Sequence, residues 1–289
     1  MNTSPPNVQP GWPAAAYGPD GFARLDGENF PEFAPGTVWL VGAGPGAPGL
    51  VTLLAYHAMR HCDIVVHDAL VNNEILKWVR PGAELEYAGK RGGKPSPKQR
   101  DISLRLIELA RQGKRVLRLK GGDPLIFGRG GEEAGQLAAA GIGFRIVPGI
   151  SAGIGGLAYA GIPATHRDLN HAVTFLTGHD ASGNLPANVD WAAIANATPV
   201  IVMYMAVKHL NEIASELVKG GRDPRHAVTI ISNATLPAQT VAETTLDAVP
   251  EFLKRNDPPT PAIVVIGNVT NLRRVLQWYE GELRENALG

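Results

Sequence analysis

The sequence has little cysteine, no surplus of either charge and no long uninterrupted apolar run. Its single cysteine, Cys62, excludes an intramolecular disulfide and is typical of a reducing compartment. Lys and Arg together number 27, as do Asp and Glu, and this zero net charge argues against a general nucleic-acid or membrane-surface binder. The longest charge-free run, about 146–164, contains five glycines and two prolines, which favour a broken helix over a membrane span. No signal-peptide pattern opens the chain, so we expect a cytoplasmic protein with no membrane or nucleic-acid partner.

Glycine and proline, by contrast, are abundant. The 289 residues include 34 Gly and 23 Pro, where average usage would give about 35 of the two together. A hydrophobic content of 44% and a charged content of 19% argue against a disordered chain, and the lack of a Gly-X-Y period excludes collagen. We therefore expect the surplus glycines in loops where the backbone closely approaches another group.

The first 35 residues differ from the rest in composition. They hold seven prolines and four glycines but few aliphatic residues. This favours a disordered or loosely packed arm over 1–35. The alternative is an arm that docks on a partner through Trp12, Tyr17 and Phe22.

From residue 36 onward, short apolar runs alternate with helical stretches. Strands are expected at 37–41, 63–67, 84–88, 115–120 and 144–147, with helices at 53–59, 102–111 and 132–140. The pattern restarts with strands at 173–177, 199–204, 227–232 and 262–266, and with helices at 208–219 and 271–279. This order predicts an α/β protein with two α/β domains, 36–167 and 168–289, and mainly parallel sheets.

Several chemically distinctive loops follow the predicted strands, where ligands bind in open parallel sheets. Counted from Gly44, the loop 42–49 has the spacing G-x-G-x-x-G of dinucleotide-binding loops, but Pro45 and Pro48 interrupt it. The loop is therefore either a nicotinamide-binding site or a structural turn. In the loop 121–124, two glycines permit close approach, and the Asp123 carboxylate can accept hydrogen bonds from ligand hydroxyl or amino groups.

Other strand-end residues also have a structural alternative. Asp68 is either a helix cap or a catalytic carboxylate, and Ser151 is either a helix N-cap or a ligand contact. The run KRGGKPSPKQR contains five cations and no acid, so it is either a solvated loop or a clamp for a polyanionic small molecule. It has no interleaved aromatic residues to stack on single-stranded nucleic acid.

Eight motifs, in order, resemble the tetrapyrrole methylases over about residues 37–280. They are VWLVGAGPG (38–46), IVVHDALV (64–71), AGKRGGKPSPKQ (88–99), VLRLKGGDPLIFGRGGEE (116–133), VPGISAG (147–153), GIPATHRD (161–168), HAVTFLTGH (171–179) and VIVMYM (200–205). Several long motifs in the same order are more specific than any one of them.

The resemblance implies a homodimer that holds S-adenosylmethionine in a cleft between two α/β domains and needs no metal. It implies C-methylation of uroporphyrinogen III at C-2 and C-7, giving precorrin-2 by way of precorrin-1. Asp68 matches the family's proton acceptor and Lys90 its proton donor. The cofactor contacts match Pro45, Gly121, Gly122, Asp123, Ile126, Ser151, Ala152, Met205 and Ala234. The cations expected to face the substrate's eight carboxylates are Arg91, Lys94, Lys98 and Arg100.

The sequence departs from the family pattern at three positions. Ala47 stands where Asp is usual, which puts the polarity of that loop in question, while Leu125 replaces an aromatic residue and Ser151 replaces Thr. The family's bifunctional siroheme enzymes have an extra N-terminal region that 35 residues cannot hold, so we expect a monofunctional chain. The alternatives are a methylase of a later corrin intermediate, an NAD(P)-dependent oxidoreductase or a tetrapyrrole carrier. The destination of the product, cobalamin or siroheme, stays open.

Overall fold

The computed structural model describes residues 30–88, 99–180 and 182–279. Almost all of the expected arm, 1–35, therefore lies outside the described residues. Two five-stranded sheets form within the compact unit Phe33–Gly289. All nine strands predicted from the sequence are present, and each starts and ends within one residue of its predicted bounds.

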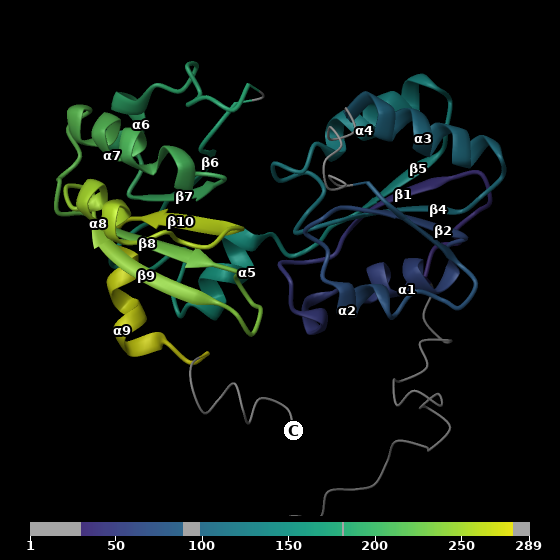
Figure 1. The fold of residues 1–289 in the computed structure, drawn as a ribbon, viewed down its shortest axis with the longest axis horizontal. Coiled ribbons are helices and arrows are strands. Elements are labelled where there is room, and N and C mark those ends of the chain that lie inside the picture. Colours follow the sequence, from purple (N-terminus) through teal and green to yellow (C-terminus); the bar gives the residue numbers. More distant parts are fainter. Residues whose placement is uncertain (1–29, 89–98, 181, 280–289) are drawn as a thin grey trace, which may run out of the picture. The chain divides into compact units, whose positions relative to one another are not determined.

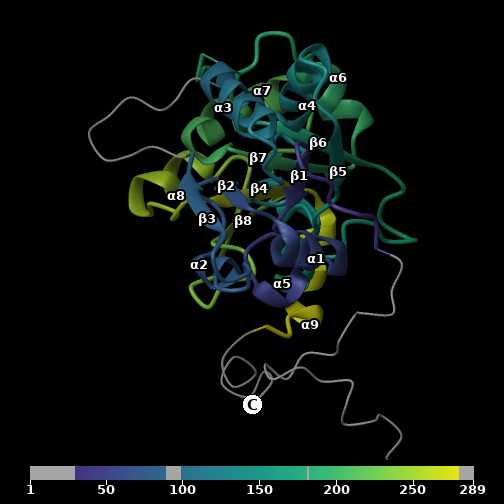
Figure 2. The same ribbon diagram turned by 90° about the vertical axis from the view of Figure 1, so that its right-hand side faces the viewer.

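The first sheet is wholly parallel, as predicted, with the strand order β3-β2-β4-β1-β5. Its strands are β1 (Val38–Gly42), β2 (Ile64–His67), β3 (Glu84–Tyr87), β4 (Val116–Lys120) and β5 (Phe144–Val147). Its helices are α1 (Leu53–His61), α2 (Asn73–Leu76), α3 (Gln99–Arg111) and α4 (Gly130–Ala139). Successive strand residues point to opposite faces, so Val38 and Leu40 pack toward α3 and α4, whereas Trp39 and Val41 pack toward α1 and α2. The two pairs of helices lie on opposite faces of the sheet (Figures 1 and 2).

The second sheet is mixed, with the strand order β6-β7-β10-β8-β9. Its strands are β6 (Val173–Thr177), β7 (Val200–Tyr204), β8 (Ala227–Ser232), β9 (Thr240–Thr245) and β10 (Ala262–Ile266). The α/β fold class is confirmed, but in this sheet only β6 and β7 pair in parallel. The strands β8 and β9 are antiparallel because the segment that connects them, 233–239, is too short for the crossover that a parallel pair needs. Strand β9 was not predicted, because its sequence TVAETT has few apolar residues.

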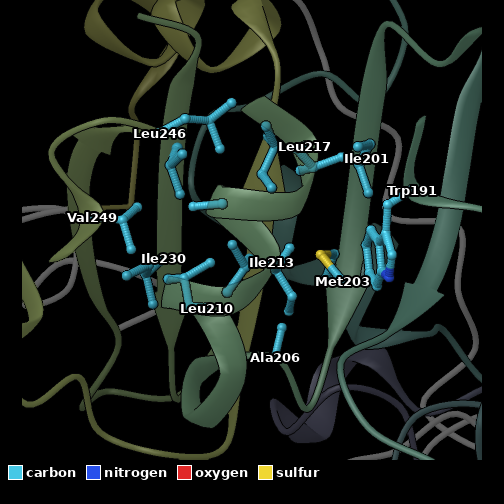
Figure 3. Packing of buried hydrophobic residues seen from close by; sticks show 14 of the residues in the cluster. Trp191, Ile201, Met203, Ala206, Leu210, Ile213, Leu217, Ile230, Leu246 and Val249 are labelled. Atoms are coloured by element: carbon cyan, nitrogen blue, oxygen red, sulfur yellow. The ribbon is translucent and has the colours of Figure 1, made fainter. Parts of the chain in front are cut away.

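Helices also cover both faces of the second sheet. They are α5 (Ala152–Tyr159), α6 (Trp191–Ala197), α7 (Leu210–Lys219), α8 (Val249–Arg255) and α9 (Arg273–Leu276). On α7, Leu210, Ile213 and Leu217 recur at helical spacing and pack with Met203 and Ile230 of the sheet (Figure 3). Burying each of these side chains contributes about 1.5–3 kcal/mol to the free energy of unfolding. This core therefore holds α7 against β7 and β8.

The glycine-rich run 146–164 contains a helix, α5, which the sequence reading did not predict. Its glycines allow close packing: a Cβ atom at Gly155 would lie 2.8 Å from Pro45, and one at Gly156 would lie 2.9 Å from Ala234. Tertiary contacts on both sides therefore override the low helix propensity of glycine. Across the described ranges, no helix is long and apolar enough to cross a bilayer.

Candidate functional site

The loops that follow strands of both sheets surround a cavity of about 880 Å³, within the size range of small-molecule sites. All nine residues predicted to contact the cofactor line this cavity, and so does Asp68. The nine are Pro45, Gly121, Gly122, Asp123, Ile126, Ser151, Ala152, Met205 and Ala234. The structure thus brings together residues that are as much as 189 positions apart in the sequence (234 − 45).

Three loops of the first sheet are tied to one another by hydrogen bonds. The N–H of Gly44 donates to the carbonyl of Gly122 over 3.2 Å, and the N–H of Gly122 donates back over 2.7 Å. The Asp123 carboxylate accepts the N–H of Leu125 on one oxygen, at 2.8 Å, and the N–H of Gly149 on the other, at 3.1 Å. Asp123 therefore orders its own loop, and each oxygen keeps a lone pair for a further donor.

Tyr204, at the end of β7, forms part of the opposite wall. Its hydroxyl lies 2.6 Å from the Ser151 hydroxyl and accepts the N–H of Gly153 at 3.0 Å. Burial raises the pKa of Tyr204, so the hydroxyl stays neutral at physiological pH. Ser151 occupies the N-cap position of α5, but its side chain makes no capping hydrogen bond and contacts Tyr204 instead. The cap interpretation is therefore wrong for the side chain.

Backbone strain is concentrated around this cavity. Phe127, Arg129, Met205 and Asn233 have φ values of 50°, 60°, 54° and 48°, and all four line the cavity. Positive φ is unfavourable for residues other than glycine, and it persists where the surrounding structure imposes it, often at functional sites. The strain supports the assignment of this cavity as the functional site.

Asp68 does not cap a helix. The N-cap of α2 is Asn72, whose side chain accepts the N–H of Glu74. The Asp68 carboxylate instead lies 2.5 Å from the Arg118 guanidinium and 3.6 Å from the Lys120 ammonium. Asp68 thus presents a carboxylate, paired with two cations, at the cavity wall.

Two cations and one carboxylate behind Asp68 were missed as site residues. Arg118 and Lys120 are 1% and 3% exposed and line the cavity, and both contact the fully buried Glu133. The signal was present in RVLRLK, because two cations at alternate positions of a central strand require buried carboxylate partners.

The basic run could not be placed. Lys90, Arg91, Lys94 and Lys98 lie outside the described residues, and only the backbone of Arg100, at the start of α3, is described. Their predicted roles stay predictions.

The loop 42–49 lacks the context of a dinucleotide site, which needs a helix that starts directly at the glycines. Here the last glycine of the spacing, Gly49, lies inside a 3₁₀ turn, Pro48–Leu50, and α1 starts only at Leu53. Ala47 is the N-cap of that turn and is not part of the cavity lining. Its N–H donates to the Thr235 hydroxyl at 2.9 Å, so this contact across the cavity rim does not depend on the side chain at 47.

Comparisons with known proteins agree with this geometry. The family described as tetrapyrrole (corrin/porphyrin) methylases matches residues 37–250. A uroporphyrinogen-III C-methyltransferase from Sinorhizobium sp. is 62% identical over 86% of this chain and 89% of its own length. A siroheme synthase from Pseudomonas fluorescens is 45% identical over 87% of this chain. The match covers only 54% of the length of that siroheme synthase. The crystal structure of the uroporphyrin-III C-methyltransferase from Thermus thermophilus, complexed with S-adenosylhomocysteine, has a TM-score of 0.71 at 37% identity and covers 82% of this chain and 99% of its own.

The chain belongs to the tetrapyrrole methylase family. The predicted family, the predicted fold class and the expectation of a methyltransferase are therefore confirmed.

Proposed function

We propose that the chain is an S-adenosylmethionine-dependent C-methyltransferase that methylates uroporphyrinogen III at C-2 and C-7, giving precorrin-2 by way of precorrin-1. The observation that carries the proposal is the cavity that joins the residues matching the family's cofactor contacts to the carboxylate of Asp68. The 62% identity to the Sinorhizobium enzyme, over most of both chains, supports the same substrate.

The cavity residues fit the cofactor chemically. Asp123 has a free lone pair on each oxygen for ligand hydroxyl or amino donors, and Ser151 offers a hydroxyl. The Gly121-Gly122 pair lets a ligand approach the backbone closely. When bound, S-adenosylmethionine would supply an electrophilic methyl group, and the loops would orient it toward the substrate carbon, so that positioning provides much of the rate.

In this proposal Asp68 accepts a proton from the substrate. Once the methyl group has passed from sulfur to a pyrrole carbon, the macrocycle is cationic, and it must release a proton from a neighbouring methylene bridge because every carbon of the ring is already substituted. A carboxylate at the cavity wall can take that proton, and Arg118 and Lys120 hold the Asp68 carboxylate in place there. Solvent then removes the proton before the second methylation.

The substrate's eight carboxylates call for cations around the cavity. Arg129, at the N-terminus of α4, and Lys208, in the turn after β7, both line it. We propose that Lys90 donates a proton and that Arg91, Lys94, Lys98 and Arg100 bind substrate carboxylates, as the resemblance implies. In support, Ile102, close behind these residues on α3, also lines the cavity.

The test combines product analysis with a binding control. Purified protein, supplied with S-adenosylmethionine and uroporphyrinogen III, should give a product whose mass shows two added methyl groups. Asp68→Ala should abolish turnover and leave S-adenosylhomocysteine binding within about twofold by calorimetry. Methylation of a later corrin intermediate alone, in a substrate panel, would refute the substrate assignment. Loss of binding in Asp68→Ala would make Asp68 a structural residue.

We also propose that the enzyme is a cytoplasmic homodimer. In support of a dimer, the end of the described chain exposes apolar side chains, with Val275 84%, Leu276 46% and Trp278 46% exposed. The buried Cys62 and the lack of any other cysteine support a reducing compartment. Light scattering at micromolar concentration should give twice the chain mass, and a monomer mass would contradict the dimer.

A further inference from the structure

Four charged side chains at the cavity wall form one connected network, in which only Glu133 does not line the cavity. Arg118 contacts Asp68 at 2.5 Å and Glu133 at 3.1 Å. Lys120 contacts the same two carboxylates, Asp68 at 3.6 Å and Glu133 at 3.1 Å. Asp68 lines the cavity with 30% of its side chain exposed, whereas Glu133 is fully buried and is not part of the lining. The network thus has an exposed carboxylate and a hidden one that share two cations.

The sequence produces this arrangement through strand register. Val66 of β2 lies opposite Arg118 of β4, so Asp68, two residues later, falls on the same face and near Lys120. Residues 116, 118 and 120 face α3 and α4, and Glu133 lies in the first turn of α4. A helix and two adjacent strands therefore bring the four side chains together.

The charges in the network sum to zero, and this bears on how readily Asp68 takes up a proton. Two cations beside a lone carboxylate would strongly favour its ionised form and make it a poor proton acceptor. Glu133 offsets part of that attraction, since it contacts both cations from the buried side. A catalytic base must be ionised before the reaction and still accept a proton during it.

We propose that Glu133 is a positioning residue that holds Arg118 and Lys120 against Asp68 and sets how readily Asp68 accepts the substrate proton. The inference rests on the proposed function, in which Asp68 is the base. Glu133 does not touch the substrate; it acts through the two cations.

The other charged and titratable groups near Asp68 are accounted for separately. Arg129 and Glu132, on the side of α4, pair with each other at 2.7 Å. The carboxylate of Asp123 is held by two backbone N–H groups, and Lys208 of the second sheet donates to the Gly183 carbonyl. Besides Arg118 and Lys120, the charged and titratable groups that line the cavity or adjoin Asp68 in the described residues are His67, Asp123, Arg129, His179, Tyr204 and Lys208. Of these groups Arg129 also interacts with Glu133, both through charge and through the Glu133 N–H, which donates to the Arg129 carbonyl at 3.2 Å. Removing the charge of Glu133 therefore acts on Arg129 as well as on the balance between Asp68 and the two cations, so the effect on Asp68 has to be measured at Asp68 itself.

The network predicts opposite effects for two neutralising substitutions. Glu133→Gln leaves both cations acting on Asp68, so the acid limb of the kcat–pH profile should move down by about one pH unit and kcat at neutral pH should fall about tenfold. Lys120→Gln removes one of these cations, so the acid limb should move up by a similar amount. The double variant Lys120→Gln/Glu133→Gln restores the zero sum, and its acid limb should return toward the wild-type position. Glu133→Asp keeps the charge and should keep the acid limb, whatever it does to kcat.

The profiles should be measured with S-adenosylmethionine and uroporphyrinogen III for each variant, with Glu216→Gln as a control. Glu216 is an exposed helix residue of α7 that pairs with Lys219, and its removal should leave the profile unchanged. If Glu133→Gln and Lys120→Gln move the acid limb in the same direction, or lower kcat without moving it, the proposal is overturned and Glu133 only supports the structure. Loss of a buried charge partner can prevent folding. If Glu133→Gln does not fold, the test rests on the upward shift of the acid limb in Lys120→Gln and on the reversal of that shift in the charge-balanced double variant.

A second readout separates this proposal from the proposed function. In ¹³C-labelled protein without substrate, the Asp68 carboxyl can be assigned by its loss in Asp68→Asn and titrated by NMR. The titration should follow the same order, with Glu133→Gln lowest, wild type intermediate and Lys120→Gln highest. If that order holds but uroporphyrinogen III is not methylated, the substrate assignment fails and the role of Glu133 stands. If methylation proceeds and the order is absent, Glu133 does not act on Asp68.

Discussion

Removing the Tyr204 hydroxyl should weaken the wall of the cavity that α5 and β7 share. Tyr204→Phe keeps the ring, whose centroid lies 4.9 Å from that of Phe127 and 6.2 Å from that of Phe175. Only the hydroxyl is lost, together with its contacts to Ser151 at 2.6 Å and to the N–H of Gly153 at 3.0 Å. The substitution therefore isolates two hydrogen bonds from the surrounding packing.

The magnitude follows from those two bonds. A hydrogen bond contributes about 0.5–1.5 kcal/mol net, and an unsatisfied buried donor costs about 1–3 kcal/mol. The N–H of Gly153 lies in the first turn of α5, where backbone donors have no partner within the helix. We therefore expect Tyr204→Phe to lower the free energy of unfolding by about 2 kcal/mol. Urea denaturation, with an unchanged slope against urea, measures this directly.

Ser151→Ala is the matched comparison, because it removes only one of the two bonds. It should cost about 1 kcal/mol, and the double variant with Tyr204→Phe should cost little more than Tyr204→Phe alone. Because both side chains line the cavity, both variants should also weaken S-adenosylhomocysteine binding severalfold in calorimetry. Fully additive costs would show that the two hydroxyls do not interact. A change below about 0.5 kcal/mol in Tyr204→Phe would refute the argument that this hydroxyl holds the start of α5.

Three further predictions concern other parts of the chain. Ala47→Asp should add a side-chain cap to the 3₁₀ turn and raise the free energy of unfolding by about 0.5 kcal/mol. It should leave kcat unchanged because residue 47 does not line the cavity. A rise in kcat would show that alanine at position 47 impairs catalysis. Gly156→Ala should lower the melting temperature because its Cβ would lie 2.9 Å from Ala234. Gly135→Ala, in α4, should raise the melting temperature because no atom lies within 4 Å of the added Cβ. Equal shifts in the two variants would contradict the packing argument for α5. Burial raises the pKa of the Cys62 thiol from 9.0 to about 12, so its contribution to stability is full below about pH 9 and is lost as the pH rises toward 12. Cys62→Ala should therefore show a shallower loss of stability over that range in denaturation curves, and an unchanged slope would mean that Cys62 does not titrate there.

Much of the fold could be predicted from local sequence, because buried strands such as VWLVG and AIVVI are runs of apolar residues that end at glycine or polar residues. Strand β9 and helix α5 could not. The strand TVAETT lies at the edge of its sheet, where a half-exposed strand tolerates polar residues. The helix AGIGGLAY has three glycines that local propensity places outside helices. Only the contacts of those glycines with Pro45, Tyr204 and Ala234 explain why it forms.

The loops of the site could be predicted from the sequence, whereas the ion pairs between its charged side chains could not. Strand ends marked the loops, and the resemblance assigned residues that the structure then gathers around one cavity. The charge network was not predictable from position alone. Acidic residues in the first turn of a helix are usually exposed, yet Glu133, in the first turn of α4, is fully buried against Arg118 and Lys120. The proposed role of Glu133 depends on the register of the strands and on how α4 packs on β4. Neither of these can be derived from the local sequence.

The surplus of glycine has a physical role that links these observations. The walls of the cavity belong to different sheets, and they meet through contacts that only small residues permit. Pro45 packs on Gly155 of α5, and the N–H of Ala47 reaches Thr235 beside Gly46, where a Cβ would lie 2.9 Å from Leu236. The cavity lining includes glycine backbone and the four residues with positive φ, so the shape of the cavity depends on packing between the sheets. A larger side chain at Gly155 would push against Pro45 and would therefore displace the other cofactor contacts and Asp68 as well, although it does not touch them.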